Sequence, residues 1–296
     1  MKNWRKYNKS LVQRGSLDLY IDPELEKCSE PEASCEVGRP QLHSDVIIAL
    51  ALTLQAVYQL PLRQTQGLLA SVFHLAGLRL PVPDYSTLSR RRASMLGAVW
   101  AKPGDTIAID STGLQIKGPG SWLTTVHGHQ RRSWRKVHLG VDTATGEVVA
   151  ALCTGVGSPD CRQLPKLLNQ AKPRPKTKVM VDGAYDRRCC YDAAGQHGLR
   201  LVAPPRHDAV IHPGDPSLRK RNKAIKRIRK VGLKRWKKET HYHRRSIIES
   251  TMWRLKSAFG TRLRSRSVPN QDQETLLRLQ ILNRWPTPNA LAFRKN

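Results

Sequence analysis

Residues 104 to 206 alternate between strand-like and helix-like patterns, and this order restricts the fold more than any other feature of the sequence. Three strand-like runs come first, DTIAIDSTGLQI, WRKVHLGVD and EVVAALCT, and the turn sequence TATG joins the last two. A helical pattern, a strand, a second helical pattern and a final strand follow. The order β, β, β, α, β, α, β predicts an α/β domain with a mixed sheet and flanking crossover helices.

Two aspartates stand at the ends of predicted strands in this domain. Asp110 closes the first strand-like run and Asp182 closes the run KTKVMVD. Catalytic groups in α/β sheets gather at the carboxyl ends of strands, so both are candidate catalytic residues. Asp142 precedes the turn sequence and Asp186 lies beyond its strand end, so we interpret them as a turn residue and a helix cap.

The first hundred residues carry a different pattern. Residues 1–40 are polar and irregular and are interpreted as an arm, and residues 41–103 contain three helical runs. The third run, DYSTLSRRRASMLG, has Asp84 as its candidate N-cap. This order resembles a helix-turn-helix, whose last helix would present Arg90, Arg91 and Arg92 to DNA. A plain helical bundle with a basic solvent face explains the same spacing.

The net charge favours a nucleic-acid partner. The chain carries 51 Lys and Arg against 23 Asp and Glu, a formal charge of +28. Self-repulsion of this size destabilises a compact state unless a polyanion neutralises it, and DNA is the densest such partner. No apolar run is long enough to span a membrane, and no secretory signal or zinc-site cysteine spacing occurs. We therefore expect a cytoplasmic DNA-binding protein without membrane contact or small-molecule cofactor.

Residues 207–241 form a short basic insertion. Within it, RKRNKAIKRIRKVGLKRWKK holds twelve Lys and Arg and no acid. Apolar residues are interleaved with the charges, which is more typical of an ordered segment than of a solvated tail. We expect this segment to lie against a nucleic-acid backbone. The candidate contacts are Lys226, Arg227, Arg229 and Lys230.

The segment YHRRSIIESTMWRLK places one carboxylate among several cations. On a single helix, one polar stripe would contain Tyr242, Arg245, Glu249, Trp253 and Lys256. Ion pairs along a helix surface, such as Arg245 with Glu249, explain the charges in this stripe but not its aromatic residues.

The three carboxylates Asp110, Asp182 and Glu249 suit the cleavage of a phosphodiester. Phosphodiester cleavage needs charge stabilised on the entering and leaving oxygens, and two divalent cations held by carboxylates do this. Mg²⁺ and Mn²⁺ prefer oxygen ligands. The sequence therefore predicts that Asp110, Asp182 and Glu249 hold two Mg²⁺ or Mn²⁺ ions, while the surrounding cations hold DNA phosphates.

These motifs resemble those of a known family. Tyr242, Arg245, Glu249 and Lys256 form the pattern Y-x2-R-x3-E-x6-K, which resembles the signature of bacterial insertion-sequence transposases of the DDE type. IAIDSTGLQ and VMVDGAYD resemble the segments with that family's first and second aspartates, and DYSTLSRR resembles its N-terminal region. The resemblance extends from about residue 40 to residue 285.

The resemblance implies a ribonuclease H-like catalytic domain in two parts, residues 104–206 and 242–296, on either side of the basic insertion. It also implies cleavage at terminal inverted repeats and joining of the freed 3′-hydroxyl to target DNA, in a bacterial, nucleoid-associated setting. Tyr242, Arg245 and Lys256 would contact phosphates of the terminal strand, with Trp253 beside them. Trp236 would contact a base or pack. Because two element ends must be assembled, we expect at least a homodimer on DNA.

Two other classes remain open at this stage. A ribonuclease H-like nuclease, such as a junction resolvase, would use the same metals but would not join DNA. A catalytically inactive DNA-binding repressor would need none of the carboxylates.

Overall fold

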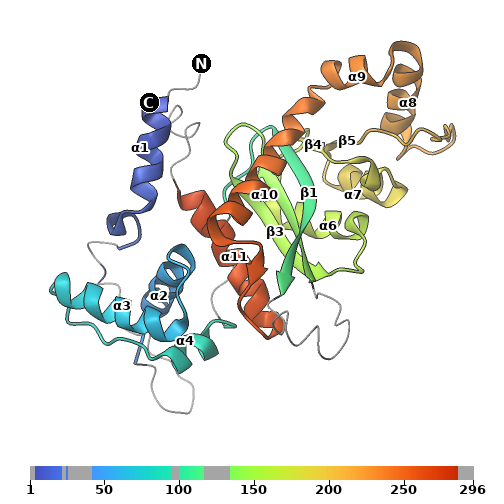
Figure 1. Ribbon diagram of the computed structural model, residues 1–296. Helices are drawn as coiled ribbons and strands as arrows, with labels where there is room; N and C mark the ends of the chain where they lie inside the picture. Colours follow the sequence, from blue (N-terminus) through green and yellow to red (C-terminus); the bar gives the residue numbers. More distant parts are fainter. Residues whose placement is uncertain (1–3, 22–24, 26–41, 95–99, 117–133, 286–296) are drawn as a thin grey trace, which may run out of the picture. The chain divides into compact units, whose positions relative to one another are not determined.

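The computed structural model describes residues 4–21, 25, 42–94, 100–116 and 134–285 (Figure 1). The chain divides into two compact units. The first comprises Met1–Ala98 together with Ser265–Asn296, and the second comprises Val99–Arg264. Each unit has its own secondary-structure class, as the change of hydrophobic pattern near residue 104 predicts.

The second unit is built on a mixed sheet of six strands in the described residues, with the order β3-β2-β1-β4-β5 and β6 beside β1. The strands β1 (Thr106–Ile116), β2 (Trp134–Asp142) and β3 (Val148–Gly155) form an antiparallel meander. The parallel pairs are β1 with β4 (Lys178–Met180), β4 with β5 (Arg200–Val202) and β1 with β6 (Arg262–Leu263). The predicted mixed α/β fold and the predicted order of elements are confirmed.

The helices α6 (Asp160–Ala171) and α7 (Arg188–Gln196) form the main core with the sheet. Ile107 and Ile109 of β1 are buried in the same core cluster as Leu164 and Leu168 of α6. Because side chains alternate along a strand, Ala108 and Asp110 project from the opposite face. α10 (Ser246–Phe259) packs along β1 and β2, with Ile248 and Leu255 buried. The short helices η2 (Gly183–Tyr185) and η3 (Tyr242–Arg245) lead into α7 and α10.

The basic insertion is helical. It forms α8 (Arg219–Val231) and α9 (Leu233–Glu239), which contact each other. Ile225 of α8 and Trp236 of α9 are buried, so the interleaved apolar residues give the insertion its order. Trp236 lies 5 % exposed against Tyr242, with their ring centroids 6.0 Å apart, which supports packing rather than base contact.

The first unit contains helices in its described residues. They are α1 (Trp4–Arg14), η1 (Leu17–Leu19), α2 (Asp45–Val57), α3 (Leu62–Leu75), α4 (Tyr85–Arg91) and α11 (Val268–Arg284). Asp84 caps α4 as predicted, because its carboxylate accepts hydrogen bonds from the amides of Ser86 and Thr87 at 2.7 and 2.9 Å. No single described helix is long and apolar enough to cross a membrane, and only α2 and α3 together, bent by 114°, reach that length and composition.

The last helix differs from our expectation. We grouped residues 242–296 with the catalytic domain, but α11 packs against α2 and belongs to the first unit. The contacts of Arg92 hold the last segment of the chain to the first unit. Its guanidinium donates to Gln55 of α2 at 2.6 Å and to Ser265 at 2.8 Å, and it lies 3.9 Å from Glu274 of α11.

Arg92 is therefore corrected from a DNA contact to a structural residue, since it is only 6 % exposed. Arg91 also has partners inside the first unit, because it donates to the His43 carbonyl and pairs with Asp45. Arg90 alone of the three is exposed.

Replacing Arg92 with Ala should lower the free energy of unfolding by about 2–4 kcal/mol, because buried Gln55 and Glu274 lose a charged partner. Arg90→Ala, at an exposed position of the same helix, should change it by less than about 0.5 kcal/mol. Denaturant unfolding of both variants provides the measurement. Equal stability of the two would contradict the structural role of Arg92.

Candidate active site

Asp110 and Asp182 lie side by side across two parallel strands. We expected Asp110 at the end of its strand, but β1 continues to Ile116 because its pairing with β2 extends to Gln115. Its other neighbour, β4, ends at Met180, which pairs with Ala108. Asp110 and Asp182 each lie two residues beyond this pair, so the parallel register places them at the same height in the sheet. The sheet edge at which the two predicted catalytic aspartates lie is thus formed by the end of β4.

The two aspartates interact electrostatically. Burial raises the pKa of the Asp182 carboxyl, and the neighbouring charge of Asp110 raises it further. An amide hydrogen bond from Ala184 to the Asp182 carboxylate, 2.9 Å long, acts in the opposite direction. Burial and the charge of Asp110 together outweigh the amide hydrogen bond and the charge of Arg245, so the ionised form of Asp182 is disfavoured.

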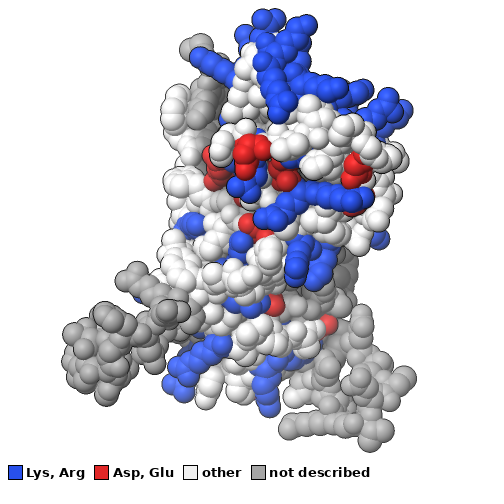
Figure 2. Space-filling model, turned by 90° about the vertical axis from the view of Figure 1, so that its right-hand side faces the viewer, with Lys and Arg blue, Asp and Glu red and all other residues white. Residues whose placement is uncertain are grey.

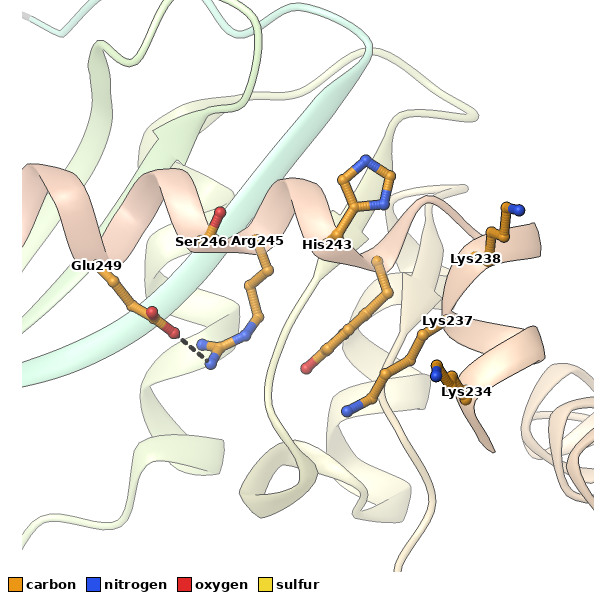
Figure 3. A pocket seen from close by; sticks show the side chains of 8 residues that line it. Lys234, Lys237, Lys238, His243, Arg245, Ser246 and Glu249 are labelled. Atoms are coloured by element: carbon orange, nitrogen blue, oxygen red, sulfur yellow. Dashed lines mark hydrogen bonds and ion pairs between the residues drawn. The ribbon is translucent and has the colours of Figure 1, made fainter. Parts of the chain in front are cut away.

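Arg245 joins Asp110 to Glu249. Its Nη1 donates to Asp110 Oδ2 at 2.6 Å and its Nη2 donates to Glu249 Oε1 at 2.9 Å. Figure 3 shows Arg245 and Glu249 on successive turns of the same segment, with the ion pair between them. The helical ion pair considered from the sequence therefore exists, and it extends to a strand more than a hundred residues away in the chain.

The three predicted metal ligands are near one another but do not form a closed cage. Within the described ranges, no three His, Cys, Asp or Glu side chains converge closely enough to hold a metal ion. Instead, the guanidinium of Arg245 supplies the positive charge between Asp110 and Glu249. The donor set of carboxylate oxygens fits Mg²⁺ or Mn²⁺ chemistry, and the raised pKa of Asp182 indicates a place where a cation would be favourable.

The structure corrects the helix that we predicted over residues 242–256. Residues Tyr242–Arg245 form η3, and α10 begins at Ser246. Tyr242 is 8 % exposed, and its hydroxyl donates to the carbonyl of Val181 at 2.8 Å. It therefore anchors η3 beside Asp182, and the prediction that it contacts a DNA phosphate is corrected.

An open pocket adjoins Glu249. It has a volume of about 430 Å³. Its lining residues are Lys234, Lys237, Lys238, Tyr242, His243, Arg245, Ser246 and Glu249. We call it the Glu249 pocket. Figure 2 shows Lys and Arg side chains gathered around and above a group of carboxylates on one face.

Lys234, Lys237 and Lys238 were not among the residues predicted from the sequence to contact DNA. Their spacing of three and four residues places them on one face of a helix, opposite the buried Trp236. That spacing is visible in the sequence KRWKK, and it could have indicated that α9, rather than α8, lines the pocket. His243, also in the pocket, carried no comparable signal.

The other predicted contacts are scattered. Trp253 on α10 is 67 % exposed and Lys256 is half-buried. On α8, Lys226 and Lys230 are exposed, Arg227 pairs with Glu239 at 2.6 Å, and Arg229 donates to the Ala209 carbonyl at 3.3 Å. None of these α8 residues lines the Glu249 pocket.

Asp142, the other strand-end aspartate near the turn sequence, makes hydrogen bonds typical of a turn residue. Asp142 accepts from the amides of Ala144 and Thr145 at 2.7 and 3.0 Å, which confirms its interpretation as a turn residue.

Tyr242→Phe should lower the free energy of unfolding by about 1–3 kcal/mol, because the buried Val181 carbonyl loses its partner. The affinity for duplex DNA should stay unchanged, since the hydroxyl bonds to the interior carbonyl of Val181. A reduced affinity with unchanged stability would restore the phosphate-contact role of Tyr242.

Asp182→Asn should raise the thermal midpoint at pH 7 in chelator-containing buffer. The folded-state pKa of Asp182 lies above the unfolded value of about 4, so its charge opposes folding at neutral pH. The advantage should shrink as the pH falls through the raised folded-state pKa to the unfolded value, because Asp182 of the native protein then becomes neutral. Exposed Asp105→Asn is the control and should leave the midpoint close to that of the unmodified protein. An Asp182→Asn advantage that does not change with pH would contradict this electrostatic picture.

Family models match most of the length of the chain. Two family models, both described as Transposase DDE domain, match residues 12–119 and 101–284. A piggyBac transposase in a synaptic complex with hairpin DNA aligns with 93 % of this chain and 73 % of its own, at 9 % identity and a TM-score of 0.41. A simian T-cell lymphotropic virus intasome bound to PP2A regulatory subunit B56 gamma aligns with 75 % of this chain and 70 % of its own, at 13 % identity and a TM-score of 0.27.

The second family match covers more than half of the chain and includes Asp110, Asp182 and Glu249. The acidic site, its sheet and its basic surroundings thus occur in a sequence that carries the family pattern. The chain belongs to the DDE transposase family.

Proposed function

We propose that this transposase binds the terminal inverted repeats of a mobile element, cleaves DNA at those ends and joins the freed 3′-hydroxyl to target DNA. The observation that supports this most is the meeting of Asp110, Glu249 and Arg245 beside Asp182, next to a pocket with three lysines. This combines carboxylates for phosphoryl transfer with cations for the DNA backbone.

Asp110, Asp182 and Glu249 would hold two divalent cations, Mg²⁺ or Mn²⁺. When bound, these ions would stabilise negative charge on the entering and leaving oxygens of the phosphodiester. Asp110 and Asp182 are fixed by β1 and by the turn after β4, whereas Glu249 is on the first turn of α10 and 60 % exposed. Glu249 is thus the ligand with the most freedom to adjust as DNA binds.

Arg245 and the lysines of α9 would hold the terminal DNA strand. Arg245 lines the Glu249 pocket and reaches both carboxylates, so its guanidinium can exchange a carboxylate for a phosphate without leaving the site. Lys256 and Trp253 on α10 and Arg90 on α4 are further proposed contacts. The α8 cations Lys226, Arg227, Arg229 and Lys230 would add long-range attraction rather than contacts at the scissile bond.

The reaction would proceed in two displacements. Water attacks phosphorus at the element end, and the bond from phosphorus to the 3′-oxygen breaks to give a 3′-hydroxyl. That hydroxyl oxygen then attacks a target phosphorus, and the target 3′-oxygen leaves with a proton. Joining two ends to one target would require at least two copies of the chain. A nuclease would stop after the first displacement, so an assay for joined products separates these functions.

Glu249→Gln should reduce end cleavage and joining by at least about a hundredfold, because it removes a charge that stabilises the transition state. DNA affinity should stay the same or increase, since one negative charge leaves a cationic pocket. The substrate is a plasmid carrying the gene and its flanking DNA. Glu239→Gln, the same change on exposed α9, should retain activity. Normal cleavage by Glu249→Gln would exclude the proposed role.

The α9 lysines should account for part of the DNA affinity. Replacing Lys234, Lys237 and Lys238 with Gln should lower the slope of log affinity against log salt by about three units. The matched variant carries Gln at Lys166, Lys172 and Lys176, which are exposed around α6, and should leave the slope near its original value. Equal slopes for both triple variants would show that the Glu249 pocket does not hold the DNA backbone.

A further inference from the structure

A second pocket begins one residue after Asp182. It has a volume of about 440 Å³. Its lining residues are Gly183, Ala184, Asp186, Arg187 and Arg206. We call it the Arg187 pocket. It shares no lining residue with the Glu249 pocket, and none of the residues predicted from the sequence to contact DNA lies in it.

The carboxylate in this pocket does not make it acidic. Asp186 was expected to cap a helix, but its side chain is fully buried and its Oδ1 accepts from Arg221 Nε at 2.8 Å and from the Tyr191 hydroxyl at 2.9 Å. The ion pair to Arg221 neutralises Asp186 and ties α8 to the turn after β4. The charge offered to a ligand is therefore that of Arg187 and Arg206.

Both arginines are available to a ligand. Arg206 is 63 % exposed, and its ion pair is with the equally exposed Asp208, 3.5 Å away. Exposed pairs of this kind contribute about 0–1 kcal/mol, so a phosphate can replace the carboxylate. Arg187 is exposed and immediately precedes α7, whose amino end adds a favourable partial charge for an anion. Two guanidinium groups around one cavity suit the bidentate geometry of a phosphodiester.

The two pockets adjoin different residues of the same carboxylate group, Glu249 in one case and Asp182 in the other. The Glu249 pocket includes Glu249 and Arg245, and Arg245 holds Asp110. The Arg187 pocket starts at Gly183, the residue after Asp182, and Asp182 is level with Asp110 in the register of β1 and β4. A joining reaction must bring two DNA segments to one set of carboxylates, and each segment needs its own phosphate contacts to fix its position. The arrangement offers one cationic pocket for each segment.

We propose that Arg187 and Arg206 bind a phosphate of the second DNA segment, the target strand that receives the 3′-hydroxyl. This inference rests on the proposed joining activity and adds to it the residues that select the target backbone. It assigns the terminal strand to the Glu249 pocket and the target strand to the Arg187 pocket.

The test uses the double variant Arg187→Gln/Arg206→Gln with pre-cut element ends and a target plasmid. Joining should fall at least tenfold, while end binding and end cleavage stay at the level of the unmodified protein. Arg162→Gln/Arg174→Gln, at two exposed arginines of α6 and the loop after it, is the matched control and should join normally. Arg187→Lys/Arg206→Lys should recover part of the activity, because the charge is kept and the bidentate geometry is lost.

A second measurement does not depend on catalysis. Protein saturated with unlabelled end DNA is titrated with a labelled duplex of unrelated sequence, and the salt slope of this binding should fall by about two units in the Gln double variant. Thermal unfolding verifies that the variant is folded.

Unchanged joining together with unchanged binding of the second duplex would overturn the inference. A joint loss of end binding and end cleavage would also overturn it, since the pocket would then serve the element end. If the unmodified protein neither cleaves nor joins DNA, the proposed function fails, while the binding of the second duplex still tests the Arg187 pocket on its own.

Discussion

The bridge from Arg245 to Asp110 and Glu249 is the interaction on which the rest of the site depends. Burial, and after it the neighbouring charge of Asp110, raise the pKa of Asp182, so negative charge at this place is costly. Arg245 offsets this cost for Asp110 and Glu249 with two hydrogen bonds of 2.6 and 2.9 Å. It also fixes the start of α10 against β1, so the same contact organises the charge and the fold of the site.

The elements around this bridge are held by buried contacts that bring distant segments together. Tyr242 fastens η3 to the carbonyl of Val181, and Trp236 packs against Tyr242. The Arg221–Asp186 ion pair fastens α8 to the turn after β4. Both helices of the basic insertion are thus attached to residues next to the proposed catalytic carboxylates. The chain has a net charge of +28, and ion pairs of Arg221 with Asp186 and of Arg227 with Glu239 offset part of the repulsion within the insertion.

The sequence was sufficient for features that depend on local pattern. The alternation of apolar residues predicted the strands, Asp84 predicted the start of α4, and the order of elements predicted the mixed sheet. It was insufficient where a distant partner decides the role of a residue. Arg92 is basic and belongs to a short helix, yet Ser265, 173 residues away, and Gln55 make it a buried structural residue. Tyr242 fits a helical stripe, but its bond to Val181 favours a tighter 3₁₀ turn there. Asp110 lies inside a longer strand because only β4, and not β2, ends at its level.

The central claim is that Asp110, Asp182 and Glu249 form a metal-dependent centre for DNA phosphoryl transfer. The most direct test is single-turnover cleavage of a plasmid carrying the gene and its flanking DNA, first in excess EDTA and then after addition of excess Mn²⁺. The unmodified protein should show no cleavage in EDTA and recovery with Mn²⁺, whereas Asp110→Asn should show no recovery. Cleavage that persists in EDTA, or that Mn²⁺ restores equally in Asp110→Asn, would contradict the central claim.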